Sequence, residues 1–402
     1  MPHTSTHPFT ARVGAVLAQL HETGQYKRLQ TITGPMGATI TLEGYGECLC
    51  FCSNNYLGLA NHPEVVEAGI KGLKDFGAGT ASVRFICGTF SPHLALEKRI
   101  AAFLGVDAAY TFVSCWNANE AIFPTLCEPG DLIISDELNH ASIIDGVRLA
   151  TIIKKGLNKA VFKHNDHADL RAKLANARRD LASDAALWVV TDGVFSMEGD
   201  LPNLPGLRAL CDEFGALLVI DDSHGTGVMG KTGRGVHEHF GMKGSDIDFF
   251  TGTLGKALGG GAGGFIAGPK DAIDLIVQRG RPTLFSNALP VTVAFSAAKA
   301  IEILDREPER VGRLRDNTAY ARKSLKDAGF EVIDSPTAIC PIIVGDTATA
   351  IAMSTRLLEL GVFVIGFGYP VVPEGSARLR VQISAAHTRA HIDALVAAMK
   401  KL

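Results

Sequence analysis

Apolar residues in the middle of the chain recur in short unbroken runs separated by helical spacing. Residues 187–190 form one such run, a helical pattern follows over 204–214, and a second run occupies 216–220. Unbroken apolar runs are typical of strands buried on both faces, and two such strands joined through a helix form a parallel βαβ unit. The pattern from about residue 63 to 267 therefore predicts an α/β domain on a mixed or parallel sheet.

Polar residues follow these runs where the predicted strands end. The run at 216–220 leads into Asp221-Asp222-Ser223-His224, and two further runs, 247–251 and 264–267, flank a glycine-rich turn. Open α/β sheets bind ligands at the carboxyl ends of their strands. These positions are therefore candidates for a ligand site.

The N-terminal end of the chain has a different pattern. Residues 11–27 place Val13, Val16, Leu17 and Leu20 at helical spacing, which predicts an amphipathic arm that docks on another surface. Short strand signals follow at 38–42 and 48–52. These strands predict a small sheet outside the central domain.

The C-terminal end resembles the N-terminal end in having short strands. A charged helical stretch over 305–322 precedes three strand signals, at 341–344, 362–365 and 377–384. A final amphipathic helix follows Thr388, its expected N-cap. We predict a smaller α+β domain built from both chain ends, with boundaries at 1–62 (N-terminal arm and small-domain segment), 63–290 (large cofactor-binding domain) and 291–402 (C-terminal small domain).

The amino-acid composition predicts that part of the protein surface is buried in a subunit interface. The 402 residues are 47% hydrophobic and only 20% charged, with a mean hydropathy of +0.17. Globular proteins average about 25% charged residues, so we expect surface to be buried against another subunit. The 39 Lys and Arg balance 42 Asp and Glu, which argues against a nucleic-acid or membrane-surface partner.

The N-terminal residues and the spacing of the cysteines bear on the cellular location of the protein. No apolar run reaches the roughly 20 residues of a spanning helix, and residues 1–10 lack a targeting pattern. The eight cysteines show neither disulfide nor zinc spacing. We predict a cytoplasmic protein with reduced thiols, no metal and no membrane span.

The glycine-rich turn around Lys256 first suggests a nucleotide loop, and spacing argues against it. A P-loop requires glycine at position 250 and serine or threonine at 257, which are Phe250 and Ala257 here. A dinucleotide fingerprint follows its strand, whereas these glycines precede the strand at 264–267. Both nucleotide readings are therefore weak.

A lysine at a strand end beside a hydroxyl suits another cofactor. Pyridoxal phosphate needs an amine for a Schiff base and a hydroxyl near its phosphate, and Lys256 and Thr253 offer these groups. It also needs a carboxylate on its pyridine nitrogen, for which Asp221 is the candidate, and His224 could contact the phenolic oxygen. Each residue alone has a structural explanation, and together they favour pyridoxal chemistry.

Two more strand ends contribute polar residues. His140 follows the run at 132–134 and opens a helix, so it could lie over an aromatic ring or cap the helix. Ser114 and Cys115 follow the run at 109–112 and precede another helix, whose free amides form an anion site. Either cluster could serve packing alone.

These motifs, in this order, resemble the α-oxoamine synthases, pyridoxal-phosphate enzymes of fold type I. The resemblance covers nearly the whole chain, from Ser53 to Thr388. Its stretches are specific for the family and fairly specific for the member that uses glycine and acetyl-CoA; they are residues 53–59, 81–89, 138–148, 191–197, 281–287, 369–373 and 384–388.

The resemblance implies two catalytic residues, Lys256 and His140. Lys256 would hold the cofactor and remove a proton from the substrate Cα, and His140 would stack on the cofactor ring. The remaining cofactor contacts would be Asp221 (pyridine nitrogen), His224 (phenolic oxygen), Ser196 (near the cofactor), Ser114, Cys115 and Thr253 (phosphate), and Ser286 and Asn287 from the neighbouring subunit (phosphate).

The substrate carboxylate would bind Asn54 and Arg380 by the same resemblance. Arginine suits this task because its guanidinium binds a carboxylate through two parallel hydrogen bonds. Arg378 is a second arginine nearby that could be confused with Arg380.

The implied reaction condenses glycine with acetyl-CoA to 2-amino-3-oxobutyrate and CoA, reversibly, as in threonine breakdown. The implied assembly is a homodimer with shared active sites. Alternatives within the family are serine with palmitoyl-CoA, alanine with a pimeloyl thioester, or synthesis of a signal molecule. Transamination and a non-catalytic partner subunit are further alternatives, and the joint presence of Lys256, Asp221, His224 and Arg380 argues against the latter.

Two departures bear on the acyl group. Relatives usually read Phe-Asp-Ala-Asn-Gly-Gly where this chain has Trp116-Asn117-Ala-Asn-Glu120-Ala, which leaves the preferred acyl length open. Relatives that use succinyl-CoA place small polar residues around the arginine at position 84, and here Val83 and Phe85 flank it. We therefore expect succinyl-CoA to be disfavoured.

Overall fold

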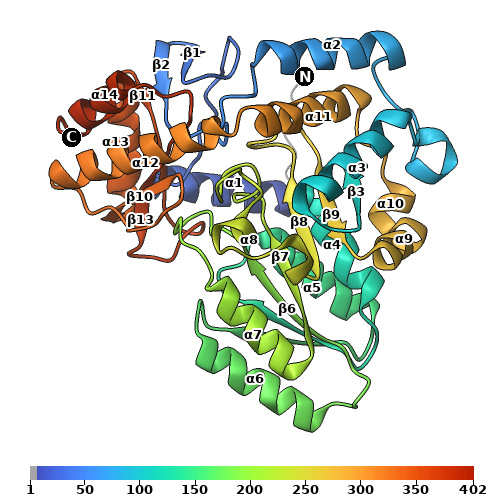
Figure 1. Ribbon diagram of the computed structural model, residues 1–402. Coiled ribbons are helices and arrows are strands. Elements are labelled where there is room, and N and C mark those ends of the chain that lie inside the picture. Colours follow the sequence, from blue (N-terminus) through green and yellow to red (C-terminus); the bar gives the residue numbers. More distant parts are fainter. Residues whose placement is uncertain (1–6) are drawn as a thin grey trace.

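The central region forms one seven-stranded sheet in the computed structural model, which describes residues 7–402 (Figure 1). The strands, in sheet order, are β3 (Ala108–Phe112), β9 (Gly264–Gly268), β8 (Phe249–Thr253), β7 (Ala216–Asp221), β6 (Leu187–Asp192), β4 (Leu132–Asp136) and β5 (Asn158–Phe162). Strand β9 is antiparallel to both of its neighbours, and the other neighbouring pairs are parallel. The predicted mixed sheet is confirmed, and the carboxyl ends of β4 to β8 lie at one edge.

Helices cover both faces of this sheet. In β6, Val189 packs into the cluster that includes α6 and α7, whereas the next residue, Val190, packs into the cluster with α4 and α5. Burial on both sides explains the unbroken apolar runs. The helical segments of this region are α2 (Pro63–Phe76), η1 (Arg84–Gly88), α3 (Ser91–Leu104), α4 (Cys115–Leu126), α5 (Ala141–Ile153), α6 (His167–Asp180), α7 (Leu204–Phe214), α8 (Val236–His239), η2 (Gly244–Asp246), α9 (Lys270–Arg279) and α10 (Arg281–Phe285).

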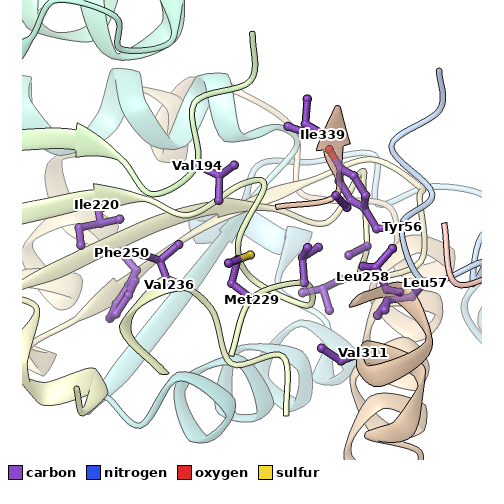
Figure 2. Close-up of a cluster of buried hydrophobic side chains, with 14 of the residues drawn as sticks. Tyr56, Leu57, Val194, Ile220, Met229, Val236, Phe250, Leu258, Val311 and Ile339 are labelled. Carbon is purple, nitrogen blue, oxygen red and sulfur yellow. The ribbon is translucent and has the colours of Figure 1, made fainter. Parts of the chain in front are cut away.

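The two chain ends meet beside the sheet and share its core. One small sheet has the order β1 (Thr39–Leu42), β2 (Gly46–Cys50), β11 (Val362–Phe363), and a second has β10 (Ile339–Gly345), β13 (Ala377–Gln382), β12 (Ile365–Phe367). Figure 2 shows Tyr56 and Ile339 from the chain ends in the same buried cluster as Ile220 and Phe250 of the large sheet. The remaining helices are α11 (Val291–Arg306), α12 (Glu309–Asp327), α13 (Thr347–Glu359) and α14 (Arg389–Met399), the last capped by Thr388 as expected.

Several boundaries differ from those that the sequence predicts. The helical stretch expected at 305–322 is divided between α11 and α12, which Glu307 and Pro308 separate. The strand expected at 362–365 is divided between two sheets, because β11 pairs with β2 and β12 with β13. The N-terminal helix α1 (Pro8–Glu22) ends five residues before Lys27, at a turn where Gly24 has a left-handed φ of 68°. None of the residues of α1 is buried, so its apolar face is uncovered within this chain.

The cysteines pack as single residues. Cys48 and Cys50 lie buried with Ile40 and Leu42 between the N-terminal strands and α13, and all eight thiols are free. Among residues 7–402, no helix is both long and apolar enough to cross a membrane.

Candidate active site

Asp221 ends β7 at the centre of the sheet edge and is buried. Its carboxylate accepts a hydrogen bond from Nδ2 of Asn119 at 2.7 Å and one from the Ser223 amide at 3.0 Å. The thiol of Cys115 lies 3.5 Å from the same carboxylate. Within residues 7–402 these donors are neutral and no cation is hydrogen-bonded to the carboxylate, which suits a group that must meet a protonated ring nitrogen.

Lys256 follows the neighbouring strand β8 and is half-buried. Burial lowers the pKa of its amine, and the charge of Asp221 partly opposes this. Within residues 7–402, no hydrogen bond or ion pair holds Nζ. A lysine with these properties loses its proton more readily than a solvated one, as a nucleophile or base requires.

His224 is buried one turn beyond Asp221, with Nδ1 2.8 Å from the hydroxyl of Tyr56. Burial, reinforced by the charges of Lys256 and Arg380, holds its pKa well below the usual range. The ring is therefore neutral near pH 7. Because Tyr56 occupies Nδ1, Nε2 is the nitrogen left for a ligand.

His140 is the N-cap of α5, and its Nδ1 lies 2.7 Å from Oγ of Ser142. Its backbone amide donates to the carboxylate of Asp192 at 2.9 Å, which ties the cap to the end of β6. Burial raises the pKa of Asp192 well above its usual range. The imidazole itself reaches the protein surface, free to lie over a flat ligand.

The start of α4 forms an anion site beside these groups. Ser114 caps the helix by accepting from the Asn117 amide at 3.2 Å, and Gly264 of β9 lacks the Cβ that would collide with the Cys115 backbone. At the end of strand β8, Oγ1 of Thr253 accepts a hydrogen bond from the Gly255 backbone amide at 3.0 Å and donates one to the Gly263 carbonyl at 3.1 Å. Free amides at a helix start are a ready phosphate site.

Ser286 and Asn287 lie near this helix start in the same chain. They line a small pocket together with Val113 and Asn117 of the segment that leads into α4. The side chain of Asn287 is exposed. Both residues directly follow Phe285, which is exposed.

Arg380 and Arg378 on β13 differ sharply in their partners. Arg378 is buried and bonded to Glu198 at 3.2 Å and to the Met197 carbonyl at 3.0 Å. Arg380 donates only to the Ser196 carbonyl, at 3.0 Å, and its buried Nε has no hydrogen-bond partner among residues 7–402. Arg380 is therefore the arginine that can bind a carboxylate.

Gln382 connects Asn54 to the strand that carries Arg380. The side-chain amide of Gln382 contacts Asn54 at 2.7 Å and the Tyr56 hydroxyl at 2.8 Å, and Gln382 is two residues beyond Arg380 on β13. The same amide thus links the expected carboxylate site to the tyrosine that holds His224.

Sequence reasoning missed Asn119, Tyr56 and Asp192 as parts of the site. Asn119 positions Asp221, Tyr56 positions His224, and Asp192 positions His140. The only signal was that Asp192 follows a buried run, because the other two contacts span more than a hundred residues of chain.

The arrangement fits pyridoxal phosphate on its own terms. It combines the amine of Lys256, which has no partner among residues 7–402, with the buried carboxylate of Asp221, the exposed imidazole of His140 and the backbone amides at the start of α4. In the same order, these four protein groups suit the aldehyde, the pyridine nitrogen, the ring face and the phosphate of that cofactor.

Known proteins match nearly the whole chain. A family model described as aminotransferase class I and II matches residues 46–399. Proteins named 2-amino-3-ketobutyrate coenzyme A ligase, from mammals and bacteria, are 42–45% identical to it. The mitochondrial one of Homo sapiens is 45% identical over 376 residues, 93% of this chain and 87% of that protein.

Two further matches have different names. An 8-amino-7-oxononanoate synthase of Symbiobacterium thermophilum is 43% identical over 387 residues, 95% of each protein. A solved structure of serine palmitoyltransferase from S. paucimobilis, with PLP and myriocin bound, matches with a TM-score of 0.90 at 29% identity, over 98% of both chains.

Proposed function

Because the chain belongs to the aminotransferase class I and II family, and within it to the α-oxoamine synthases of fold type I, we propose that it condenses glycine with acetyl-CoA. The products are 2-amino-3-oxobutyrate and CoA: a bond forms between glycine Cα and the acetyl carbonyl carbon, and the thioester C–S bond breaks. The observation that carries the proposal is Arg380, whose Nε has no hydrogen-bond partner within residues 7–402, beside Lys256 and His224 in a chain this similar to 2-amino-3-ketobutyrate coenzyme A ligases.

Each side chain of the site has a task in this reaction. Pyridoxal phosphate, when bound, supplies an electron sink that stabilises negative charge at the substrate Cα. With that cofactor bound, Asp221 would hold the proton on its pyridine nitrogen and His224 would donate to its phenolic oxygen through Nε2. Lys256 Nζ would take the proton from Cα. Arg380 and Asn54 hold the carboxylate so that this proton faces the amine.

A direct assay tests the proposal. Purified protein mixed with glycine and acetyl-CoA is expected to release free CoA thiol only when both substrates and pyridoxal phosphate are present. The reverse reaction, from 2-amino-3-oxobutyrate and CoA, is expected to form acetyl-CoA, as a step in threonine breakdown would require. Thiol release that does not depend on glycine would contradict the proposal.

Arg380→Lys is expected to raise the KM for glycine about 10- to 100-fold, with a smaller effect on kcat. The reason is that lysine keeps the charge and loses the paired hydrogen bonds, each charged bond contributing about 1.5–3 kcal/mol. Steady-state kinetics with varied glycine measures the effect.

Arg378→Lys is the matched control, since the two arginines lie on the same strand. Arg378 serves the buried contact with Glu198, so its variant should lose thermal stability while the KM for glycine stays near the wild-type value. Equal KM increases in both variants would remove the distinction between the two residues.

Arg84 bears on the acyl group. Its guanidinium is buried, bonds both carboxylate oxygens of Glu97 at 2.7 and 3.2 Å, and stacks 4.6 Å from the Tyr110 ring. The Arg84 cation also donates through Nε to Oγ1 of Thr89 at 3.1 Å and through Nη1 to Oγ1 of Thr111 at 3.3 Å. It offers no partner to the free carboxylate of succinyl-CoA, which favours an uncharged acyl group.

A homodimer with shared sites is part of the proposal. Phe85, Ile86 and Phe285 are 60–76% exposed on η1 and α10, which contact each other, and the apolar face of α1 is uncovered as well. Exposed apolar patches of this kind are typical of subunit interfaces. Ser286 and Asn287 follow Phe285 directly, so a second copy on this patch would bring its phosphate site near them.

Mixing two inactive variants tests the sharing. Co-expression of Lys256→Ala with Ser286→Ala/Asn287→Asp should restore activity, because one site of the mixed dimer then has every residue intact. Lys256→Ala mixed with Asp221→Ala is the control and should stay inactive, since both residues serve the same chain's site. No recovery in the first mixture would mean that Ser286 and Asn287 act within their own chain.

Location and domain boundaries complete the proposal. A cytoplasmic location is supported by the eight free thiols, although the mammalian relatives are named mitochondrial. The division at 62 and 290 follows the separation of the large sheet from the two small ones.

The alternative that the comparisons favour is 8-amino-7-oxononanoate synthesis from alanine and a pimeloyl thioester. Its support is the 43% identity to the Symbiobacterium thermophilum protein. The alternative would be established if the thiol of the pimeloyl thioester were released faster with alanine than CoA is released with glycine and acetyl-CoA.

A further inference from the structure

Glu120 holds two side chains at the start of α4 at the rim of the site. Its Oε1 accepts a hydrogen bond from the indole Nε1 of Trp116 at 2.9 Å. Its Oε2 accepts one from the side-chain Nδ2 of Asn117 at 3.3 Å. The two partners lie four and three residues before Glu120, the spacing at which helical side chains meet. We call Trp116, Asn117 and Glu120 the α4 clamp.

The clamp reaches the phosphate-binding turn through Ser114. The side chain of Asn117 donates to Glu120 through Nδ2, and its Oδ1 therefore faces Ser114. The Ser114 hydroxyl donates a hydrogen bond to this Oδ1 at 3.0 Å. One carboxylate thus orients a chain of hydrogen bonds from the indole to the helix cap.

Trp116 borders the mouth of the site. Its ring centroid lies 6.1 Å from that of His140, at an interplanar angle of 79°, and the indole is 40% exposed. Asp221 and His224 are buried, whereas His140 and Trp116 reach the surface. His140 and Trp116 therefore form the solvent-exposed side of this group of residues.

We propose that Trp116, held by Glu120, determines the length of the acyl group that the site accepts, with Glu120 as its positioning residue. The inference rests on the proposed acyl transfer. A fixed indole leaves room for a short acyl group and blocks a longer one, whereas an indole released from Glu120 can turn aside. Trp116, Asn117 and Glu120 are also three of the four positions in residues 116–121 at which this chain departs from the usual pattern of its relatives.

Fluorescence tests the clamp without turnover. The chain has two tryptophans. Trp188 is buried, and its indole nitrogen has no partner in the described part of the chain, so Trp188→Phe isolates the Trp116 signal. In the apoenzyme of that background, Glu120→Ala should shift the emission to longer wavelength and increase quenching by acrylamide. Glu120→Gln keeps an acceptor and should resemble Glu120. Identical spectra for the alanine and glutamine variants would overturn the clamp.

Acyl-chain profiles test the specificity. With glycine, kcat/KM is measured for acetyl-, butyryl- and hexanoyl-CoA, and Trp116→Ala and Glu120→Ala should each raise the hexanoyl-to-acetyl ratio about tenfold, as expected for apolar discrimination of a few methylenes. Glu120→Gln should keep the wild-type ratio. Glu120 lines a cavity between α4, α5 and α10.

The outcomes separate the two proposals. An unchanged ratio in Trp116→Ala, or in a Glu120→Ala variant with altered fluorescence, would overturn the specificity role. A wild-type enzyme that turns over no acyl-CoA with glycine would overturn the proposed function, while the fluorescence would still decide whether Glu120 holds the indole.

Discussion

Lys256→Ala is expected to lower the rate of CoA release about 10⁴-fold or more, because it removes the group that transfers the Cα proton. The variant should also lose the visible absorbance that pyridoxal phosphate has when it is joined to a lysine. The half-buried, unbonded amine of Lys256 is the structural reason for both effects.

An exposed lysine serves as the control for this variant. Lys270 lies at the start of α9 in an ion pair with Asp274, and its alanine variant should keep both the colour and the rate. Unchanged absorbance in Lys256→Ala, with activity retained, would contradict the assignment of Lys256.

Asp221→Ala is expected to lower kcat on the order of 10³-fold, which corresponds to about 4 kcal/mol of transition-state stabilisation. Without its carboxylate the pyridine nitrogen loses its proton, and with it most of the capacity to accept electrons. Asn119 should act in the same direction with a smaller effect, since it holds Asp221 at 2.7 Å. Single-turnover rates of Cα proton exchange in glycine measure the loss directly.

The adjacent carboxylate, Asp222, provides the matched control. It accepts from the Thr226 hydroxyl at 2.9 Å and from the Val236 amide at 3.2 Å, and burial raises its pKa to about 8. A side chain that is largely protonated at pH 7 is well imitated by asparagine. Asp222→Asn should therefore keep proton exchange, and a loss equal to that of Asp221→Ala would show that folding of the loop is what both residues serve.

Local patterns predicted the parts of the fold that depend on neighbouring residues. The apolar runs of β6 and β7 and the cap of α14 by Thr388 are properties of a few consecutive positions, and each was confirmed. The division of residues 362–367 between two sheets depends on β2 and β13, which lie far away in sequence. No local pattern contains that information.

The candidate site shows the same limit. Asp221, Lys256 and His140 could be chosen because each follows a strand, and parallel strands end at one edge. The choice of Arg380 over Arg378 required a family resemblance, and the structure supplies the physical reason, since Glu198 occupies only Arg378. Tyr56 and Asn119 were out of reach because their contacts bridge separate segments.

The glycine-rich turn also has a clearer role. It permits close packing, as where Gly264 lies against the start of α4, and it leads from Lys256 into the antiparallel strand β9. No nucleotide loop is needed to explain it.

The most direct test of the proposed function compares substrate pairs in one assay. CoA release is measured for glycine, alanine and serine, each with acetyl-, succinyl- and palmitoyl-CoA, and kcat/KM is compared across the set. The highest value is expected for glycine with acetyl-CoA, and the succinyl-CoA values should be low because Arg84 is already paired with Glu97. A higher kcat/KM for serine with palmitoyl-CoA would contradict the assignment.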